Sequence, residues 1–210
     1  MGESGDRQTV PKEQGERFEQ QIEFLLELDR LKAVLRRSYL LTTLRPENSA
    51  EHSWHIACMA LVLAEYADTP VDVSRVVAML LLHDSVEIDA GDTYCYDTDG
   101  AQDKAQRERR AAERIFGLLP PDQTRWFREI WEEFEANQTP DARFANALDR
   151  LMPLLHNYHT GGTSWMEHGI SSAQVRERME PVRLGSERLW TYACSIIDKA
   201  LAAGYLRPEA

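Results

Sequence analysis

Four side chains of the types that bind divalent metals fall on the apolar sides of three predicted helices. They are His52, the adjacent pair His83 and Asp84, and Asp149. A buried carboxylate without a counter-charge is costly, so a metal ion is the simplest partner for such a group. Two imidazoles and two carboxylates form a mixed nitrogen and oxygen donor set, which suits Mn, Fe, Co, Ni or Zn. The four residues therefore predict a site for one divalent transition metal.

Each of these residues also has an ordinary structural explanation. A single inward-facing histidine is most often a hydrogen-bonded core residue, and a single buried aspartate is most often a helix cap or a salt-bridge partner. The competing interpretation is a helical domain whose polar core residues satisfy one another. The coincidence of all four residues on helix faces favours the metal site.

The helix that carries the His-Asp pair is predicted from its apolar spacing. Val73, Val77 and Leu80 recur at gaps of four and three, which predicts one buried stripe. The same stepping continues onto Asp84 and then Glu87, so the stripe turns acidic towards its end. We expect both carboxylates to lie on the buried side of one helix, with Asp72 or Ser74 as its cap.

The other two metal-site candidates lie on helices of the same kind. His52 follows a polar turn at residues 45–48 and a predicted N-cap at Ser49. Apolar residues continue its face at gaps of four, three and four: Ile56, Met59 and Leu63. Asp149 shares a helix face with Ala145, Met152 and His156.

The rest of the pattern predicts an all-α fold. Helical spacing recurs from Phe18 to Leu35, over residues 101–119 and 126–135, and from Ser172 and Ser186 onwards. Residues 1–15 carry no apolar periodicity, so we expect a disordered tail followed by a single helical bundle over 16–210. No strand is predicted.

Composition excludes several classes of partner. A net charge of −11 argues against binding to polymeric nucleic acid or acidic membranes. The longest apolar run, Ile56 to Ala64, has nine residues, whereas a membrane helix needs about 20. The polar N-terminus resembles no signal peptide, so a cytoplasmic location is expected. The three cysteines are widely spaced and indicate neither a disulfide framework nor a thiolate zinc site.

Three segments carry a resemblance to a known family. ENSAEHSWHIACMALVLAEYA, LLLHDSVEIDAGDTYCYD and NALDRLMPLL resemble the HD-domain phosphohydrolases, most closely the branch that contains the bacterial 5′-deoxynucleotidases. The resemblance implies an all-helical domain with one divalent metal bound by His52, His83, Asp84 and Asp149. It also implies that Glu87 is an acidic catalytic residue and that Asp92 and Arg37 contact the substrate or its phosphate.

The chain departs from relatives of this kind at two points. No histidine lies between Asp84 and Asp149, whereas members with two metals carry extra histidines there, so a mononuclear site is expected. Ser38 follows Arg37, where the bacterial deoxynucleotidases carry a tryptophan that is associated with exclusion of ribose. The preference between deoxy- and ribonucleotides therefore stays open.

These roles predict a metal-dependent phosphohydrolase acting on nucleoside 5′-monophosphates. Arg37 would hold phosphate oxygens, Glu87 would orient water or protonate the departing oxygen, and Asp92 would accept a hydrogen bond from the sugar. One alternative is a nucleoside triphosphate triphosphohydrolase, although no concentrated basic set is evident in the sequence. The other alternative is a non-catalytic, metal-dependent nucleotide sensor.

Weaker candidates surround this set. His55 either supports the metal site or belongs to the core, and His156 and His159 either rim the pocket or end a helix. Tyr94 and Tyr96 either stack on a base or lie on a surface loop. The last helix is apolar on more than one side, through Trp190, Tyr192 and Ile196. That pattern, together with the dimers common among related nucleotidases, predicts a homodimer.

Overall fold

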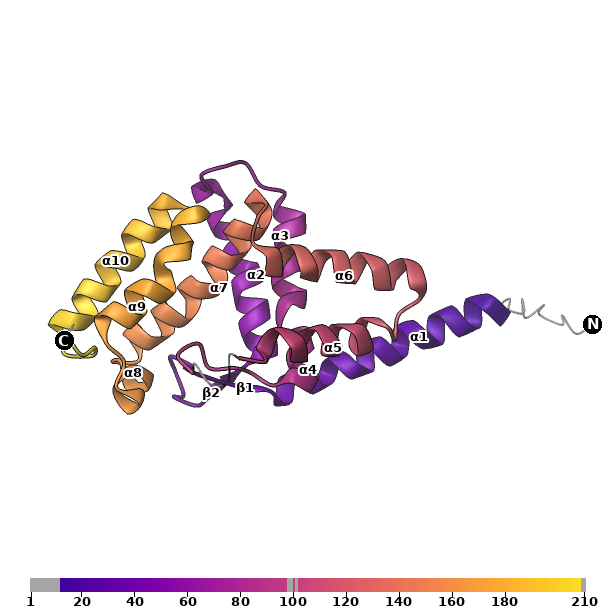
Figure 1. The fold of residues 1–210 in the computed structure, drawn as a ribbon, viewed down its shortest axis with the longest axis horizontal. Helices are drawn as coiled ribbons and strands as arrows, with labels where there is room; N and C mark the ends of the chain where they lie inside the picture. The colour runs from indigo at the N-terminus through magenta and orange to yellow at the C-terminus, as the bar shows by residue number, and fades with distance from the viewer. Residues whose placement is uncertain (1–11, 98–99, 101, 209–210) are drawn as a thin grey trace, which may run out of the picture.

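The three helices that carry the metal-site candidates lie at the centre of the molecule. The computed structural model describes residues 12–97, 100 and 102–208. Figure 1 shows α2 (Ser49–Leu63), α3 (Val73–Leu82) and α7 (Pro140–His159) grouped at the centre, with α9 and α10 on one side and α1, α5 and α6 on the other. The other helices are α1 (Lys12–Leu28), α4 (Glu87–Ala90), α5 (Lys104–Phe116), α6 (Pro121–Ala136), α8 (Thr163–His168), α9 (Ser172–Met179) and α10 (Glu187–Ala202). Short 3-10 helices occupy Asp29–Ala33, Ala64–Tyr66, His83–Val86 and Glu180–Leu184.

The all-α prediction is confirmed, with one small exception. Strands β1 (Leu35–Tyr39) and β2 (Pro46–Asn48) pair in an antiparallel sheet, although no strand was predicted. The segment LRRSY is poor in β-branched residues, so its propensity gives little strand signal. Its burial nevertheless alternates, because Arg36 and Ser38 face inward while Leu35 and Arg37 are exposed.

The helix that leads to the His-Asp pair ends earlier than predicted. Leu80 is buried as expected, but Val73 and Val77 are only partly buried, and Val76 and Met79 fill the core instead. Helix α3 stops at Leu82, and a 3-10 helix follows over His83–Val86. Residues three apart eclipse one another in a 3-10 turn, so Asp84 and Glu87 still lie on the same side.

Side-chain caps fix where two of the central helices begin. Helix α2 is capped by Asn48, not by Ser49 as predicted: the Asn48 side chain accepts from the Glu51 amide at 2.9 Å. The Glu51 carboxylate in turn accepts from the Asn48 amide at 3.2 Å, which completes a capping box. Helix α3 is capped by Asp72, which was one of its two predicted caps.

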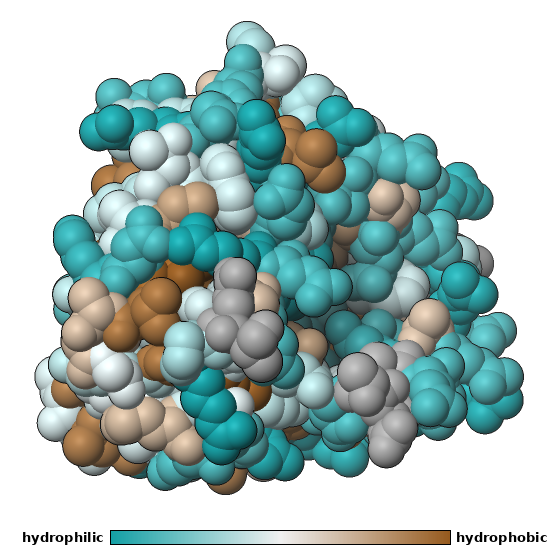
Figure 2. Space-filling view, turned by 60° about the vertical axis from the view of Figure 1, so that its left-hand side comes forward, coloured by the Kyte–Doolittle hydropathy of each residue, from teal (hydrophilic) through white to brown (hydrophobic). Residues whose placement is uncertain are grey.

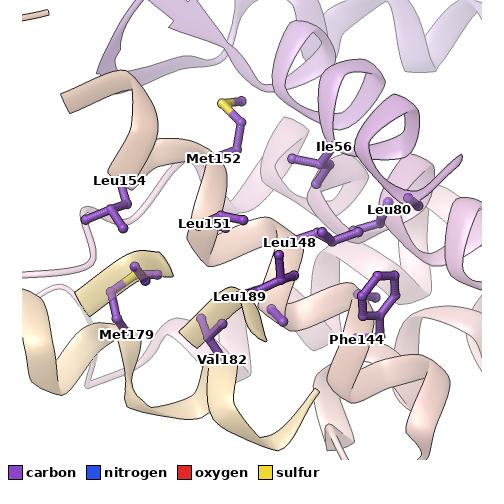
Figure 3. Packing of buried hydrophobic residues seen from close by; sticks show 14 of the residues in the cluster. Ile56, Leu80, Phe144, Leu148, Leu151, Met152, Leu154, Met179, Val182 and Leu189 are labelled. Atoms are coloured by element: carbon purple, nitrogen blue, oxygen red, sulfur yellow. The ribbon is translucent and has the colours of Figure 1, made fainter. Parts of the chain in front are cut away.

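One apolar core joins α7 to the rest of the molecule. Phe144 and Leu148 of α7 are fully buried, and they pack with Ile56 of α2 and Leu80 of α3 (Figure 3). Burying each such side chain contributes roughly 1.5–3 kcal/mol. The core therefore holds in place the three helices on which His52, the His-Asp pair and Asp149 lie.

The two ends of the chain differ from the expected packing. Residues 1–11 lie outside the described residues. Helix α1 begins at Lys12, so residues 12–15, which were predicted to belong to the tail, are helical. The division of the chain into a tail and one domain stays a prediction. Phe24 is the buried residue of α1, whereas Phe18, Leu25 and Leu26 are exposed. On α10, Ile196 belongs to the core. Tyr192 is exposed on the same helix, and a dimer surface there stays a prediction.

No described helix combines the length and apolar character needed to span a bilayer. On the face shown in Figure 2, hydrophilic residues predominate and hydrophobic ones form smaller groups.

Candidate active site

The structure brings the four metal-ligand candidates together. The Nε2 atom of His52 lies 2.9 Å from Oδ1 of Asp149. The Nε2 atom of His83 lies 2.9 Å from Oδ1 of Asp84 and 3.5 Å from Oδ1 of Asp149. The two imidazole centroids are 5.6 Å apart. Residues nearly 100 positions apart in the sequence therefore meet at one buried point, where α2, α7 and the 3-10 helix after α3 converge.

The donor atoms fit a divalent cation. One ligand atom each from His52, His83 and Asp149 lies within 4.8 Å of the others. The His83 Nδ1–H donates to the Leu80 carbonyl oxygen at 3.0 Å, which turns Nε2 towards the aspartates. That Nε2 is buried and lies 2.9 Å from Oδ1 of Asp84, but it forms no well-aligned hydrogen bond among the described residues. A nitrogen held between two carboxylates in this way is an arrangement that a bound cation would satisfy.

Electrostatics around His83 lead to the same conclusion. Burial alone would lower the pKa of His83, but the charges of Asp84 and Asp149 outweigh it and raise that pKa well above its usual value. Burial lowers the pKa of His52 to about 4, so its imidazole stays neutral. Metal binding replaces a proton on such ligands. The carboxylates that stabilise a charged His83 would stabilise a divalent cation in the same place.

Two further residues, the partly buried Arg36 and the buried Glu47, support this centre. Arg36 donates through Nη1 to Oδ2 of Asp84 at 2.7 Å. Glu47 is 1% exposed, and its Oε2 lies 3.7 Å from Nδ1 of His52. Ser38 donates to the same Glu47 oxygen at 3.3 Å. Arg36 and Arg37 are neighbours in β1, and their side chains point in opposite directions. Because no strand was predicted here, the sequence did not indicate that Arg36 faces inward.

A cavity of about 310 Å³ opens beside the metal-ligand candidates. Its volume lies at the small end of the roughly 300–1,000 Å³ that ligand sites occupy. It is lined by the predicted site residues other than His52: Arg37, His83, Asp84, Glu87, Asp92 and Asp149. Basic residues from four separate elements also line it: Arg36, Arg37, Lys104, Arg150 and Arg178. Six acidic residues line the same cavity: Asp84, Glu87, Asp92, Glu108, Glu135 and Asp149. Arg36 is paired with Asp84 and Lys104 with Glu108, so the expectation that there is no concentrated basic set stays a prediction.

Glu87 lies in this cavity in a form suited to proton donation. It is buried, and Ser49 donates to its Oε2 at 2.6 Å. Burial and then the charge of Asp84 raise the pKa of Glu87 to about 8. A carboxyl group with this pKa is largely protonated at neutral pH. Burial and the charge of Asp84 also raise the pKa of Asp92 on the same wall.

Arg37 lies at the cavity rim and not beside the metal-ligand candidates. Its side chain is exposed, and its Nη1 is 3.0 Å from Nε2 of His168. Its guanidinium carbon lies 5.4 Å from the centroid of the Tyr94 ring. Tyr94 packs edge-on against Tyr96, with ring centroids 5.3 Å apart. Both tyrosines line the cavity, so the interpretation as a mere surface loop is not supported.

Comparison with known proteins defines the class. The HD domain family matches residues 28–190, and the chain belongs to this family. The chain is 51% identical to a protein of Magnetospirillum magnetotacticum that is described as a predicted metal-dependent phosphohydrolase. The match to the crystal structure of that protein covers 95% of this chain and 100% of that one, with a TM-score of 0.90. Membership of this family implies that the protein binds a divalent metal.

Curated relatives narrow the resemblance to one branch. The human protein named 5'-deoxynucleotidase HDDC2 is 32% identical over 135 residues, which cover 64% of this chain and 65% of that protein. A 5'-deoxynucleotidase of Enterobacter sp. (strain 638) is 24% identical over 173 residues, or 78% of this chain and 85% of that protein. The chain thus spans just under two thirds of the human relative. The predicted resemblance to HD-domain phosphohydrolases of the deoxynucleotidase branch is confirmed.

Proposed function

We propose that this protein is a metal-dependent phosphohydrolase that releases phosphate from nucleoside 5′-monophosphates. The observation that carries the proposal is the buried Glu87, held by Ser49 at 2.6 Å, in the same cavity as a nitrogen and oxygen donor set. Relatives named 5'-deoxynucleotidases support the substrate class.

The proposed cofactor is one divalent transition metal: Mn, Co, Zn, Fe or Ni. His52, His83 and Asp149 would hold it, because they offer one donor atom each within 4.8 Å of the others. Asp84, whose Oδ1 lies 2.9 Å from Nε2 of His83, would complete the ligand set. A divalent cation supplies Lewis acidity, which acidifies water and draws charge from a phosphate oxygen. Arg36 would keep Asp84 ionised and oriented through their 2.7 Å bond.

Glu87 would complete the reaction as the proton donor. The oxygen of the attacking water forms a new bond to phosphorus, and the bond from phosphorus to the 5′-oxygen of the sugar breaks. The proton of the Glu87 carboxyl group passes to that departing oxygen, which is a poor leaving group as an alkoxide. The protons of the water stay with the released phosphate, and one of them returns to the Glu87 carboxylate to restore it. The hydrogen bond from Ser49 holds the carboxyl group in place for this transfer.

The cavity rim would bind the rest of the nucleotide. Arg37 would exchange its contact with His168 for the non-bridging phosphate oxygens, which its planar guanidinium suits. Asp92 would accept a hydrogen bond from a sugar hydroxyl. Tyr94 and Tyr96 offer aromatic faces for the base. At the position associated with ribose exclusion, the small Ser38 side chain lines the cavity and is bonded to Glu47, so we expect ribonucleotides to be accepted as well.

A second candidate activity is the release of tripolyphosphate from nucleoside triphosphates. Arg37, Arg150 and Arg178 line the cavity and would supply positive charge for a longer phosphate chain. A nucleotide sensor without turnover is the third possibility, but it gives no reason for a protonated carboxyl group beside the metal centre.

The test is phosphate release from a panel of ribo- and deoxynucleoside mono- and triphosphates. Metal-stripped protein would be supplied with Mn, Co, Zn or Mg, alongside the Asp84→Ala and Glu87→Ala variants. Inorganic phosphate from monophosphates, lost in both variants, is the expected result. Tripolyphosphate from triphosphates would select the second candidate, and binding without turnover would select the sensor.

We also propose a cytoplasmic homodimer. Turnover of free nucleotides suits a cytoplasmic location, and Phe18, Leu25 and Leu26 offer an exposed apolar face on α1. Sedimentation analysis of the wild-type chain and of Leu26→Ser would measure the mass; a monomeric wild type would overturn the dimer.

A further inference from the structure

We propose that Glu47, His55 and His156 form a second divalent-metal site, separate from the centre at His83. One ligand atom from each of the three lies within 4.8 Å of the others. The three side chains come from β2, α2 and α7, so only the fold brings them together. Two imidazoles and one carboxylate suit zinc, cobalt or nickel better than magnesium or calcium.

The distances within this cluster fit coordination better than direct hydrogen bonding. Nδ1 of His156 lies 3.8 Å from Oε1 of Glu47, which exceeds the roughly 2.7–3.2 Å of a hydrogen bond. Two ligands bound to one tetrahedral zinc at its usual bond lengths are about 3.3–3.5 Å apart. The imidazoles of His55 and His156 lie side by side, with centroids 5.8 Å apart. A cation could therefore be bound after small side-chain movements.

Burial makes the cluster costly without a cation. His156 is 4% exposed, and its Nδ1 is buried with no hydrogen-bond partner among the described residues. Glu47 is 1% exposed; its Oε2 accepts from Ser38 at 3.3 Å and lies 3.7 Å from Nε of Arg36, whose Nη1 is bonded to Asp84. A buried carboxylate and an orphaned imidazole nitrogen are both costly groups. A shared cation would satisfy the two together.

The cluster is set apart from the cavity that holds the candidate active site. Glu47, His55 and His156 are not among the described residues that line the cavity. Glu47 links the two places, because its Oε2 faces Nδ1 of His52 at 3.7 Å while its Oε1 faces His156. His55 is partly exposed, which provides a route for the ion and room for a water as fourth ligand. A metal here would fix the carboxylate that faces His52.

The test counts metal ions and does not use catalysis. Metal-stripped protein would be equilibrated with Co²⁺ or Zn²⁺, and bound metal per chain would be measured by elemental analysis, with the visible spectrum of Co²⁺ reporting tetrahedral geometry. We expect two ions per wild-type chain and one in His156→Gln. The double variant His83→Ala, Asp84→Ala should retain one ion with the tetrahedral spectrum.

Two further variants keep the test decisive. His159→Gln changes an exposed histidine of the same helix and should still bind two ions. His55→Gln changes the partly exposed ligand, so it should fold even where His156→Gln does not, and it should bind one ion. A single ion per wild-type chain, unchanged in His55→Gln, would overturn the proposal and indicate a bridging water. A second ion that persists in both His55→Gln and His156→Gln would also overturn it.

Discussion

Replacing Glu87 with glutamine removes one proton from the proposed reaction and changes little else. The amide keeps the size of the side chain, and its oxygen can still accept the hydrogen bond from Ser49. Loss of a general acid typically costs 10²- to 10⁴-fold in rate, which corresponds to about 2.7–5.5 kcal/mol of barrier. We therefore expect kcat for nucleoside monophosphates to fall by that factor, while KM changes little.

The pH profile of the wild type gives an independent readout of the same group. Glu87 must be protonated to donate, so activity is present below its pKa and is lost as pH rises through it. Burial and Asp84 raise that pKa to about 8, and a bound cation would oppose the charge of Asp84. The alkaline limb should therefore lie at or below pH 8, and it should be absent from the residual activity of Glu87→Gln.

Two controls test whether Glu87 acts as the proton donor: a substrate with a better leaving group and a matched glutamate variant. An aryl phosphate releases a stable phenolate that needs no proton, so Glu87→Gln should lose much less activity on it than on a nucleotide. Glu108 is a second buried glutamate of the same cavity, paired with Lys104 at 3.3 Å, and Glu108→Gln should lose far less activity than Glu87→Gln. Equal losses on both substrates, or activity that rises through pH 8 to 9, would refute the role assigned to Glu87.

Three further outcomes follow from the structure. Arg37→Ala should lower kcat/KM about 10- to 150-fold, since hydrogen bonds to charged groups contribute about 1.5–3 kcal/mol; an unchanged value in a phosphate-release assay would exclude a phosphate contact. Phe144→Ala should lower the free energy of unfolding by about 3–5 kcal/mol, measured by urea titration, because Phe144 is fully buried in the core; a loss under 1 kcal/mol would contradict that packing. The small Ser38 should leave kcat/KM for ribo- and deoxynucleotides within about tenfold of each other, a difference of at most about 1.4 kcal/mol, because no bulky side chain stands at this position to exclude the ribose hydroxyl; a larger ratio would show that another residue selects the sugar.

The sequence predicted the metal-site candidates because they interrupt apolar periodicity. His52 and Asp149 each take a position that an apolar residue would otherwise hold, and such an interruption is visible without a structure. The helical class followed from the same spacing. The break at Leu82 was not visible, since the pattern continues onto Asp84 although the backbone tightens into a 3-10 turn.

The supporting residues could not be predicted in the same way. Arg36 and Glu47 act through a sheet of two short strands, whose formation depends on tertiary packing and not on the propensity of LRRSY. Lys104, Arg150 and Arg178 reach the cavity from different helices. Nothing local in the sequence indicates that their charges meet. Asn48, and not Ser49, is the N-cap of α2. The hydroxyl group of Ser49 donates a hydrogen bond to Glu87 instead.

Metal content and phosphate release, measured together on the same preparations, test the central claim most directly. Wild-type protein stripped by a chelator should lose turnover of nucleoside 5′-monophosphates and regain it with a divalent transition metal. Asp84→Ala should lose both the catalytic metal and turnover, whereas Glu87→Gln should keep the metal and lose turnover. Turnover that persists in Asp84→Ala, or full metal binding with no phosphate released from any nucleotide, would contradict the account.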